Sequence, residues 1–436
     1  MVILKNKIIQ STILLIIFSV IAKVLSFFVR IYLARTLSAD AMNIYSLASP
    51  TLVFIITIAQ MGIPAALSKV IAQSKSSASA LLTSIILSLV NNIIVITLFM
   101  LLIPFLAQII LKDAQIIPVM KAMLPMIPMV TLSGLLKGYL QGKQEHVSAC
   151  ASQMFEEIFR IIYLLISFTN APVMTPVRMA EIAMLSVFVG ECGSSLYMFI
   201  FCMIKRTAAF PVNELILKLN RASFDEILRV SIPMTSSRLI GSLTFFLEPM
   251  LMVLSVSNAS SIVATYGQLN GYVLPILTMP SFITVTLANT LLPSFTYETS
   301  HGNRKRGMKI FNVIFWICLL IGFSCSAISF FFTDQCLNLF YHNTLGSSYL
   351  KSLAWPFAFY ALQPVLSSML HAFGQSKKAM IDTLSGSVIR LLIITFLTPV
   401  LNEAALPLAL TASMLITTFM HAIRVSFYLW KEPSSA

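Results

Sequence analysis

The sequence predicts an all-α, polytopic membrane protein with about twelve transmembrane helices in two six-helix lobes. Of its 436 residues, 58% are hydrophobic and only 10% are charged, whereas soluble domains carry about 25% charged residues. The apolar segments run without interruption for roughly 20 residues, the length that a helix needs to cross a bilayer. Lipid leaves free backbone groups without partners, so only helices and closed barrels span it, and continuous apolar runs indicate helices.

The expected spans follow one another with short polar stretches between them. The first holds Lys23 and has no small-residue cleavage site, so we expect a retained helix and not a removed signal peptide. The second is interrupted by Gly62 and Pro64. The eighth is interrupted by Pro275 and Pro280, and we expect hinges at both interruptions. The spans lie near residues 8–34, 44–72, 79–110, 116–141, 147–168, 178–203, 228–256, 262–296, 309–332, 347–372, 378–399 and 404–429.

The formal net charge of +13 comes mainly from short loops between the spans. Every second loop is rich in Lys and Arg, and the loops between them hold few of either. This is the positive-inside pattern of cytoplasmic loops, so we expect both termini in the cytoplasm and no nucleic-acid partner. The basic set comprises Lys5, Lys7, Lys69, Lys75, Lys143, Lys205, Arg206, Lys218, Arg221, Arg304, Lys305, Arg306, Lys377, Lys378 and Lys431.

A polar stretch after the sixth span divides the chain. It predicts an N-terminal six-helix lobe at 1–204, a cytoplasmic amphipathic linker at 205–227 and a C-terminal six-helix lobe at 228–436. Six spans return the chain to the side on which it started, so both lobes begin from the cytoplasm. A repeat between them is then parallel, related by a pseudo-two-fold axis along the membrane normal.

Two matching stretches support this repeat. In the first lobe, Leu136-Lys-Gly-Tyr-Leu-Gln-Gly142 ends a span, a basic loop follows, and Arg160 lies inside the next span. In the second lobe, Leu370-His-Ala-Phe-Gly374 is followed by a basic loop and by Arg390. The arginine lies 16–18 residues after the glycine in both, so we expect Arg160 and Arg390 to be equivalent.

Arg160 and Arg390 lie near the middle of their spans. At 1.5 Å per residue both are roughly 18–20 Å deep, too far for the side chain to reach water easily. A charge at the bilayer centre costs about 2.5–3.5 kcal/mol, and charges inside spans mark substrate or ion pathways. We therefore expect both to bind an anionic ligand. The alternative for Arg160 is a structural ion pair with Glu156, four residues back on the same helix face.

Further cations lie in the first helix of each lobe. Lys23 and Arg30 are seven residues apart and share a helix face, and Arg35 follows near the outer end. Arg238 lies in the seventh span, the counterpart of the first. We expect all four to bind substrate together with the two deeper arginines. Arg30 and Arg35 have the alternative of reaching the outer interface by snorkelling.

The carboxylates within the spans have two open interpretations. Glu156, Glu157 and Glu248 are expected either to neutralise the arginines when no ligand is bound or to bind Na⁺ or carry H⁺. Neighbouring residues on a helix point about 100° apart, so Glu156 and Glu157 do not face one ligand together.

The sequence holds no enzyme signature. It has no Gly-rich phosphate-binding loop, its five His are scattered, and its six Cys contain no CxxC pair. The loops are too short for a catalytic domain. We therefore expect no catalytic residue, no metal site and no cofactor.

Three stretches resemble a known family: the polysaccharide flippases related to stage V sporulation protein B. This group belongs to the multidrug/oligosaccharidyl-lipid/polysaccharide exporter superfamily, which includes the lipid II flippases. The resemblance covers nearly the whole chain and is most specific around the fourth and fifth spans. The stretches are Lys23-Val-Leu-Ser-Phe-Phe-Val-Arg30, Gly62-Ile-Pro64-Ala-Ala-Leu-Ser68-Lys69, and Lys137-Gly-Tyr-Leu-Gln-Gly142 with Ser152-Gln153-Met-Phe-Glu156-Glu157-Ile-Phe-Arg160.

The resemblance implies a fold and an activity. The fold is two six-helix lobes around a V-shaped cavity that opens alternately to each side. The substrate is a polyprenyl-pyrophosphate-linked oligosaccharide or peptidoglycan precursor, moved from the inner to the outer leaflet. Lys23, Arg30 and Arg160 fall where the family has cavity cations. Arg238 and Arg390 do not come from the resemblance; we infer them from their depth within the spans and from the internal repeat. A Na⁺ gradient, an H⁺ gradient or the membrane potential is expected to drive the cycle.

The resemblance also implies a setting: a monomer in the plasma membrane of a bacterial-type cell, among membrane lipids and cell-wall synthesis enzymes. The sequence departs from the group at Ser26 and Ser38, where Gly is frequent, and at Glu248, where Asp is frequent. The twelfth span is the last, whereas lipid II flippases usually have two more. The lipid-linked sugar and the pathway, whether cell wall, capsule or spore, are therefore left open.

Three other functions compete with a flippase. A Na⁺- or H⁺-coupled exporter of small organic or drug-like molecules has the same superfamily fold, but a cavity for cations is expected to hold mainly carboxylates. A membrane-embedded glycosyltransferase or ligase needs external carboxylates or a large loop. A scaffold for wall or spore-coat assembly does not need charges inside its spans.

Overall fold

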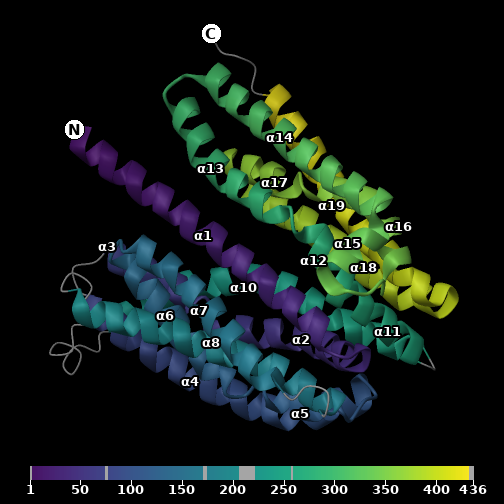
Figure 1. The fold of residues 1–436 in the computed structure, drawn as a ribbon. Coiled ribbons are helices and arrows are strands. Elements are labelled where there is room, and N and C mark those ends of the chain that lie inside the picture. The colour runs from purple at the N-terminus through teal and green to yellow at the C-terminus, as the bar shows by residue number, and fades with distance from the viewer. Residues whose placement is uncertain (1, 74–76, 170–173, 206–220, 257–258, 432–436) are drawn as a thin grey trace. The chain divides into compact units, whose positions relative to one another are not determined.

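The structure, a computed structural model, describes residues 2–73, 77–169, 174–205, 221–256 and 259–431. Within these ranges every regular element is a helix, which confirms the predicted all-α class (Figure 1). By its internal contacts the chain divides into two compact units, Met1–Phe246 and Leu247–Ala436. Most of the expected linker at 205–227, including its amphipathic stretch, lies outside the described residues.

The N-terminal unit consists of long helices and one broken pair. In chain order they are α1 (Val2–Thr36), α2 (Ala39–Gln60), α3 (Ile63–Gln73), α4 (Ser77–Pro104) with a π-helical turn (Phe105–Ile110), α5 (Ile116–Lys121), α6 (Met126–Gly142), α7 (His146–Ser167), α8 (Pro176–Ile204) and the first part of α10 (Arg221–Leu254). Apolar residues occur on most faces of these helices, as expected where lipid is the solvent.

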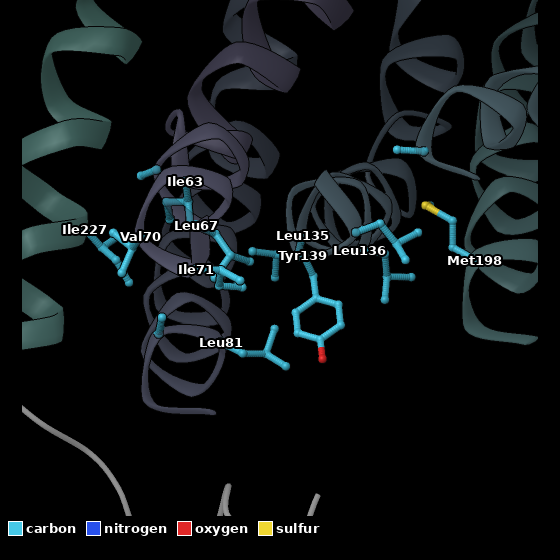
Figure 2. Packing of buried hydrophobic residues seen from close by; sticks show 14 of the residues in the cluster. Ile63, Leu67, Val70, Ile71, Leu81, Leu135, Leu136, Tyr139, Met198 and Ile227 are labelled. Atoms are coloured by element: carbon cyan, nitrogen blue, oxygen red, sulfur yellow. The ribbon is translucent and has the colours of Figure 1, made fainter. Parts of the chain in front are cut away.

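The core of the N-terminal unit lies where α3 packs on α6. Ile63 and Leu67 of α3 and Tyr139 of α6 are fully buried in one hydrophobic cluster, and Figure 2 shows all three within it. Gly138 lets the helices approach closely, because a side chain there would overlap the backbone of Pro64. This contact fixes the position of α6, which carries part of the site described below.

The C-terminal unit begins within α10 and repeats this style of packing. It continues with α11 (Ser260–Gln268), a π-helical turn (Leu269–Val273), α12 (Leu274–Thr278), α13 (Ser281–Ser300), α14 (Arg304–Phe331), α15 (Thr333–Tyr341), α16 (Ser347–Tyr360), α17 (Gln363–Ala372), α18 (Ser376–Leu401) and α19 (Ala405–Lys431). Its core joins α13, α14, α17 and α19, with Leu291, Cys318, Val365 and Leu370 fully buried.

Nine stretches of the described residues are long and apolar enough to cross a membrane, or ten if the bent pair at Ser260–Ser300 is one span. The helix α7 is not among them; it carries Glu156, Glu157 and Arg160 within 22 residues. The helices α18 and α19 count as a single stretch, Ser376–Trp430. The predicted count of about twelve is therefore not confirmed, and stays a prediction.

Helix breaks lie where Gly and Pro interrupt the second and eighth expected spans. Between α2 and α3, Met61 and Gly62 adopt φ of 45° and 61°, a left-handed conformation that favours glycine. Pro64 follows in the first turn of α3, where its missing N–H costs nothing. The second break bends the chain by 51° between Thr278 and Ser281, around Pro280. Their use as hinges remains a prediction.

The predicted internal repeat has a counterpart in the backbone of two turns. In each, three amides donate to carbonyls of the preceding helix: Lys143 to Tyr139, Gln144 to Gln141 and Glu145 to Leu140 after α6, and Phe373 to Met369, Gly374 to His371 and Gln375 to Leu370 after α17. The two sets are 230 residues apart, and so are Arg160 and Arg390. The two arginines therefore hold the same position after equivalent turns.

Candidate functional site

Charged side chains gather inside the N-terminal unit. Lys137 Nζ of α6 lies 3.2 Å from Glu156 Oε2, and Arg160 Nη1 lies 3.3 Å from Glu157 Oε2 within α7. The Ser133 hydroxyl donates to Glu191 of α8. We call this set the N-terminal charge cluster: Arg30, Lys137, Glu156, Glu157, Arg160 and Glu191.

Electrostatic contacts tie the members of this cluster together. Lys137 interacts with Glu191 as well as with its partner Glu156. Glu157 interacts with Arg30 of α1 and accepts a hydrogen bond from Ser26 on the same helix. Three cations thus face three carboxylates across four helices. The charges of this cluster balance one another within an apolar unit. The individual groups still carry charge and can exchange partners.

Arg160 is the most enclosed cation of the cluster. Its side chain is only 13% exposed, and that of its partner Glu157 is 11% exposed. The ion pair with Glu157 uses one of the five guanidinium N–H groups of Arg160. The buried Nε has no hydrogen-bond partner within the described residues. Arg160 therefore retains donor capacity beyond its ion pair.

Gly190 of α8 leaves room for the aliphatic part of the Arg160 side chain. A Cβ at Gly190 would lie 2.5 Å from Arg160 Cγ and 2.9 Å from the carbonyl oxygen of Glu156. The helices α7 and α8 can therefore pack closely only while this position lacks a side chain.

We expect Gly190→Ala to lower the free energy of unfolding by about 1–3 kcal/mol, the usual cost of overpacking. Gly241→Ala is the matched control, because Gly241 is also helical and a Cβ there meets nothing within 4 Å. It should be neutral or slightly stabilising, since Ala favours helix over Gly. Thermal unfolding in detergent measures both, and equal midpoints for the two variants would contradict this packing.

The equivalent arginine of the C-terminal unit, Arg390, also forms an ion pair with a glutamate. Arg390 Nη2 of α18 lies 2.6 Å from Glu248 Oε1 of α10, with side chains 20% and 3% exposed. The hydroxyl groups of Tyr266 and Tyr360 lie close enough to Arg390 to interact with it electrostatically. Arg390 Nε and Glu248 Oε2 are buried without a hydrogen-bond partner in the described part of the chain.

A third group lies between α18 and α19. Asp382 is fully buried, with Oδ2 3.0 Å from His421 Nδ1 and Oδ1 2.7 Å from Arg424 Nε. Gly386, one turn further along α18, allows this approach, because a side chain there would overlap Thr417. We call this set the Asp382 triad. It holds two helices together through one carboxylate.

The structure brings some of the predicted residues together and not others. Arg30 and Arg160 share the N-terminal charge cluster with Glu156 and Glu157, and Arg390 pairs with Glu248. The side chains of Lys23 and Arg238 are exposed and form no ion pair within the residues that the structure describes. Arg35 is also exposed, and so is Arg30, which joins the cluster through its electrostatic contact with Glu157.

Two pairings differ from the alternative considered for Arg160. Its partner is Glu157 and not Glu156, which pairs with Lys137 instead. The reason is the angle between neighbouring side chains on a helix, which directs Glu156 toward α6 and Glu157 toward α1. Lys137, Glu191 and the Asp382 triad were missed as site residues. A charge inside an apolar span is the signal that marks them.

Comparison with known families shows which family the chain belongs to. The family model described as "Polysaccharide biosynthesis protein" matches residues 8–297, about two thirds of the chain. The chain belongs to the polysaccharide biosynthesis protein family. A second model, MatE, matches residues 238–396.

Individual relatives agree with this family. The chain is 29% identical to stage V sporulation protein B of Bacillus subtilis over 97% of this chain and 84% of that protein. Its structure superimposes on the lipid II flippase MurJ, inward closed, with TM-score 0.73 and 13% identity over 95% of this chain and 87% of that one. An inward-facing multidrug resistance MATE transporter of the MOP superfamily gives TM-score 0.71 and 16% identity, covering 94% and 96%.

At such low identity the two structures show a shared fold alone. That fold is the fold of multi-pass membrane transporters, and it agrees with the family match of this chain. The expected superfamily is confirmed.

Proposed function

We propose that this protein is a flippase that moves a polyprenyl-pyrophosphate-linked oligosaccharide or peptidoglycan precursor from the inner to the outer leaflet. One observation carries the proposal. Two arginines at equivalent positions of a repeat are each largely enclosed, each paired with one carboxylate, and each has a buried Nε with no hydrogen-bond partner among the described residues.

Stability alone does not explain these pairs. A buried ion pair can often be replaced by apolar side chains with no loss of stability, because desolvation offsets the attraction. Charges kept inside spans mark functional sites by default. A role in ligand binding for each arginine is therefore the simpler explanation of why both are retained.

The chemistry of the guanidinium group favours a phosphate ligand. Arginine presents planar donors that match two oxygens of a phosphate at once, and it stays charged even when buried. A pyrophosphate offers several anionic oxygens and carries its charge next to an apolar polyprenyl chain. Such a molecule suits a site whose surroundings are lipid and whose cations lie at membrane depth.

The carboxylates supply the exchange that a transport cycle needs. Glu157 and Glu248 hold Arg160 and Arg390 while no substrate is bound. Pyrophosphate displaces them, and each freed carboxylate then takes up H⁺ or Na⁺ to avoid a bare charge in an apolar setting. Substrate release restores the ion pairs. The cycle thereby couples transport to a cation gradient or to the membrane potential.

The remaining predicted residues have supporting roles in this proposal. Lys23, Arg30, Arg35 and Arg238 attract the head group. The breaks at Gly62 and Pro64 and at Pro275 and Pro280 act as the hinges of alternating access, and both termini face the cytoplasm. The names of two relatives, stage V sporulation protein B and the lipid II flippase MurJ, support a lipid-linked precursor as substrate.

An ion-coupled exporter of small organic molecules is the second candidate. The MatE match and the MATE neighbour favour it. The N-terminal charge cluster contains as many carboxylates as cations, so its net charge alone does not decide between the two substrates.

The two functions are separated by a transport assay on the purified full chain in proteoliposomes. A fluorescent polyprenyl-pyrophosphate sugar and ethidium, an organic cation, are tested in turn under an H⁺ gradient, a Na⁺ gradient and a membrane potential. We expect the lipid-linked sugar to exchange leaflets and ethidium to stay at the level of protein-free liposomes. Gradient-driven ethidium transport without lipid exchange would establish the exporter instead.

A further inference from the structure

An open groove of about 1890 Å³ lies in the C-terminal unit, outside the charge clusters described above. It is formed where the turn from α13 to α14 meets the ends of α17 and α19, helices that lie near one another in Figure 1. Phe295, Phe373 and Leu429 line its inner side. None of the residues assigned to substrate binding lines it. Any ligand of this groove is therefore bound separately from the transported substrate.

One end of the groove is strongly basic. Arg304, Lys305, Arg306 and Lys309 all line it. Arg304 donates from Nη2 to the carbonyl oxygen of Leu429 at 3.2 Å, which fixes it against α19.

Three of these cations have a weak ion pair or none among the described residues. Arg306, 74% exposed, has a single long ion pair of 3.6 Å with Glu298. Lys305 and Lys309 are exposed and form no ion pair within the described ranges. Two lysines one turn apart on α14 are therefore free to bind an anion.

The other end of the groove is apolar. Val313, Trp316 and Ile317 continue along α14 from Lys309. Trp316 is 65% exposed, and Trp430 at the end of α19 is 83% exposed. Exposed Trp is typical of the membrane–water interface, where one part of the ring is apolar and the other is wet. From Lys305 to Trp316 the helix rises roughly 16 Å, so the change from basic to apolar occurs over the depth of a head-group region.

We propose that this basic groove, lined by Arg304, Lys305, Arg306, Lys309, Trp316 and Trp430, binds an anionic phospholipid of the surrounding bilayer. The lysines bind the phosphate of the head group. One acyl chain lies along α14 over Val313 and Ile317. A phospholipid matches both the charge of the basic end and the apolar surface of the other end. A free anion matches only the basic end, so we favour the phospholipid.

Lipid binding to the full chain in detergent tests the proposal by native mass spectrometry. Delipidated protein is titrated separately with phosphatidylglycerol, phosphatidylcholine and sodium phosphate. The groove variant is Lys305→Gln/Lys309→Gln. The matched control is Lys69→Gln/Lys377→Gln, which removes two exposed lysines that do not line the groove.

We expect the wild type and the control to bind phosphatidylglycerol in preference to phosphatidylcholine. The groove variant should bind it roughly 10- to 30-fold more weakly, the effect of two lysines near an anionic head group. Unchanged affinity in the groove variant, or no preference in the wild type, would overturn the proposal. So would displacement of the lipid by millimolar phosphate or by the lipid-linked sugar, which would assign the groove to a free anion or to the transported substrate.

Discussion

Asp382→Ala should lower the free energy of unfolding by roughly 3–5 kcal/mol, because it leaves the Arg424 guanidinium and the buried His421 ring without their partner. Asp382 is fully buried, and both of its carboxylate oxygens are engaged, by His421 and Arg424 on α19. Loss of the carboxylate therefore also loosens the packing of α18 on α19. Thermal or denaturant unfolding of the purified protein in detergent measures the change.

Two variants make this expectation specific to the Asp382 triad. Asp225→Ala removes an exposed aspartate and should stay within about 0.5 kcal/mol of the wild type. Asp382→Leu/Arg424→Met removes both charges, and should be more stable than Asp382→Ala because no buried charge is stranded. If the double variant were as unstable as the single one, the loss would reflect side-chain volume and not charge.

Arg160→Ala and Arg390→Ala should each reduce translocation of the lipid-linked sugar by at least roughly 30-fold, since a hydrogen bond to a charged group contributes about 1.5–3 kcal/mol and each arginine can make two. Arg→Lys at either position keeps the charge but loses the planar fork, and should give intermediate rates. Leaflet exchange in proteoliposomes measures the rates.

A simple loss of activity is ambiguous, because Arg→Ala also strands a carboxylate. The paired variants Arg160→Ala/Glu157→Gln and Arg390→Ala/Glu248→Gln remove both charges of each ion pair. They should unfold nearer to the wild type and yet remain inactive. Arg178→Ala is the control, since Arg178 also pairs with a glutamate of its own helix, at 2.7 Å, but is 57% exposed.

The helices and their breaks follow directly from local sequence. Continuous apolar segments give the helices, and Gly62, Pro64 and Pro280 lie at the breaks because of what each residue allows in its own backbone. The equivalence of Arg160 and Arg390 was also predictable, since the glycine, the basic loop and the arginine recur in order. The exact number of spans was not predictable from the sequence. The helix α7 carries several charged residues, so its composition alone does not mark it as a membrane span.

The partners of the charges were not predictable from one sequence. Glu248 lies 142 residues from Arg390, and Asp382 lies 39 residues from His421. Periodicity identifies which residues share a helix face but not which helices pack against each other. Lys137 illustrates the same limit: its place inside a span was visible, whereas its role opposite Glu156 depends on how α6 packs on α7.

In the proposed function, Arg160 and Arg390 each contribute to binding the pyrophosphate of a lipid-linked sugar. The most direct test is equilibrium binding of a polyprenyl-pyrophosphate sugar to the wild type, to Arg160→Ala/Glu157→Gln and to Arg390→Ala/Glu248→Gln, all in the same detergent. We expect saturable binding to the wild type that is lost in both charge-free variants, with their folding intact. Wild-type affinity in both variants would contradict it.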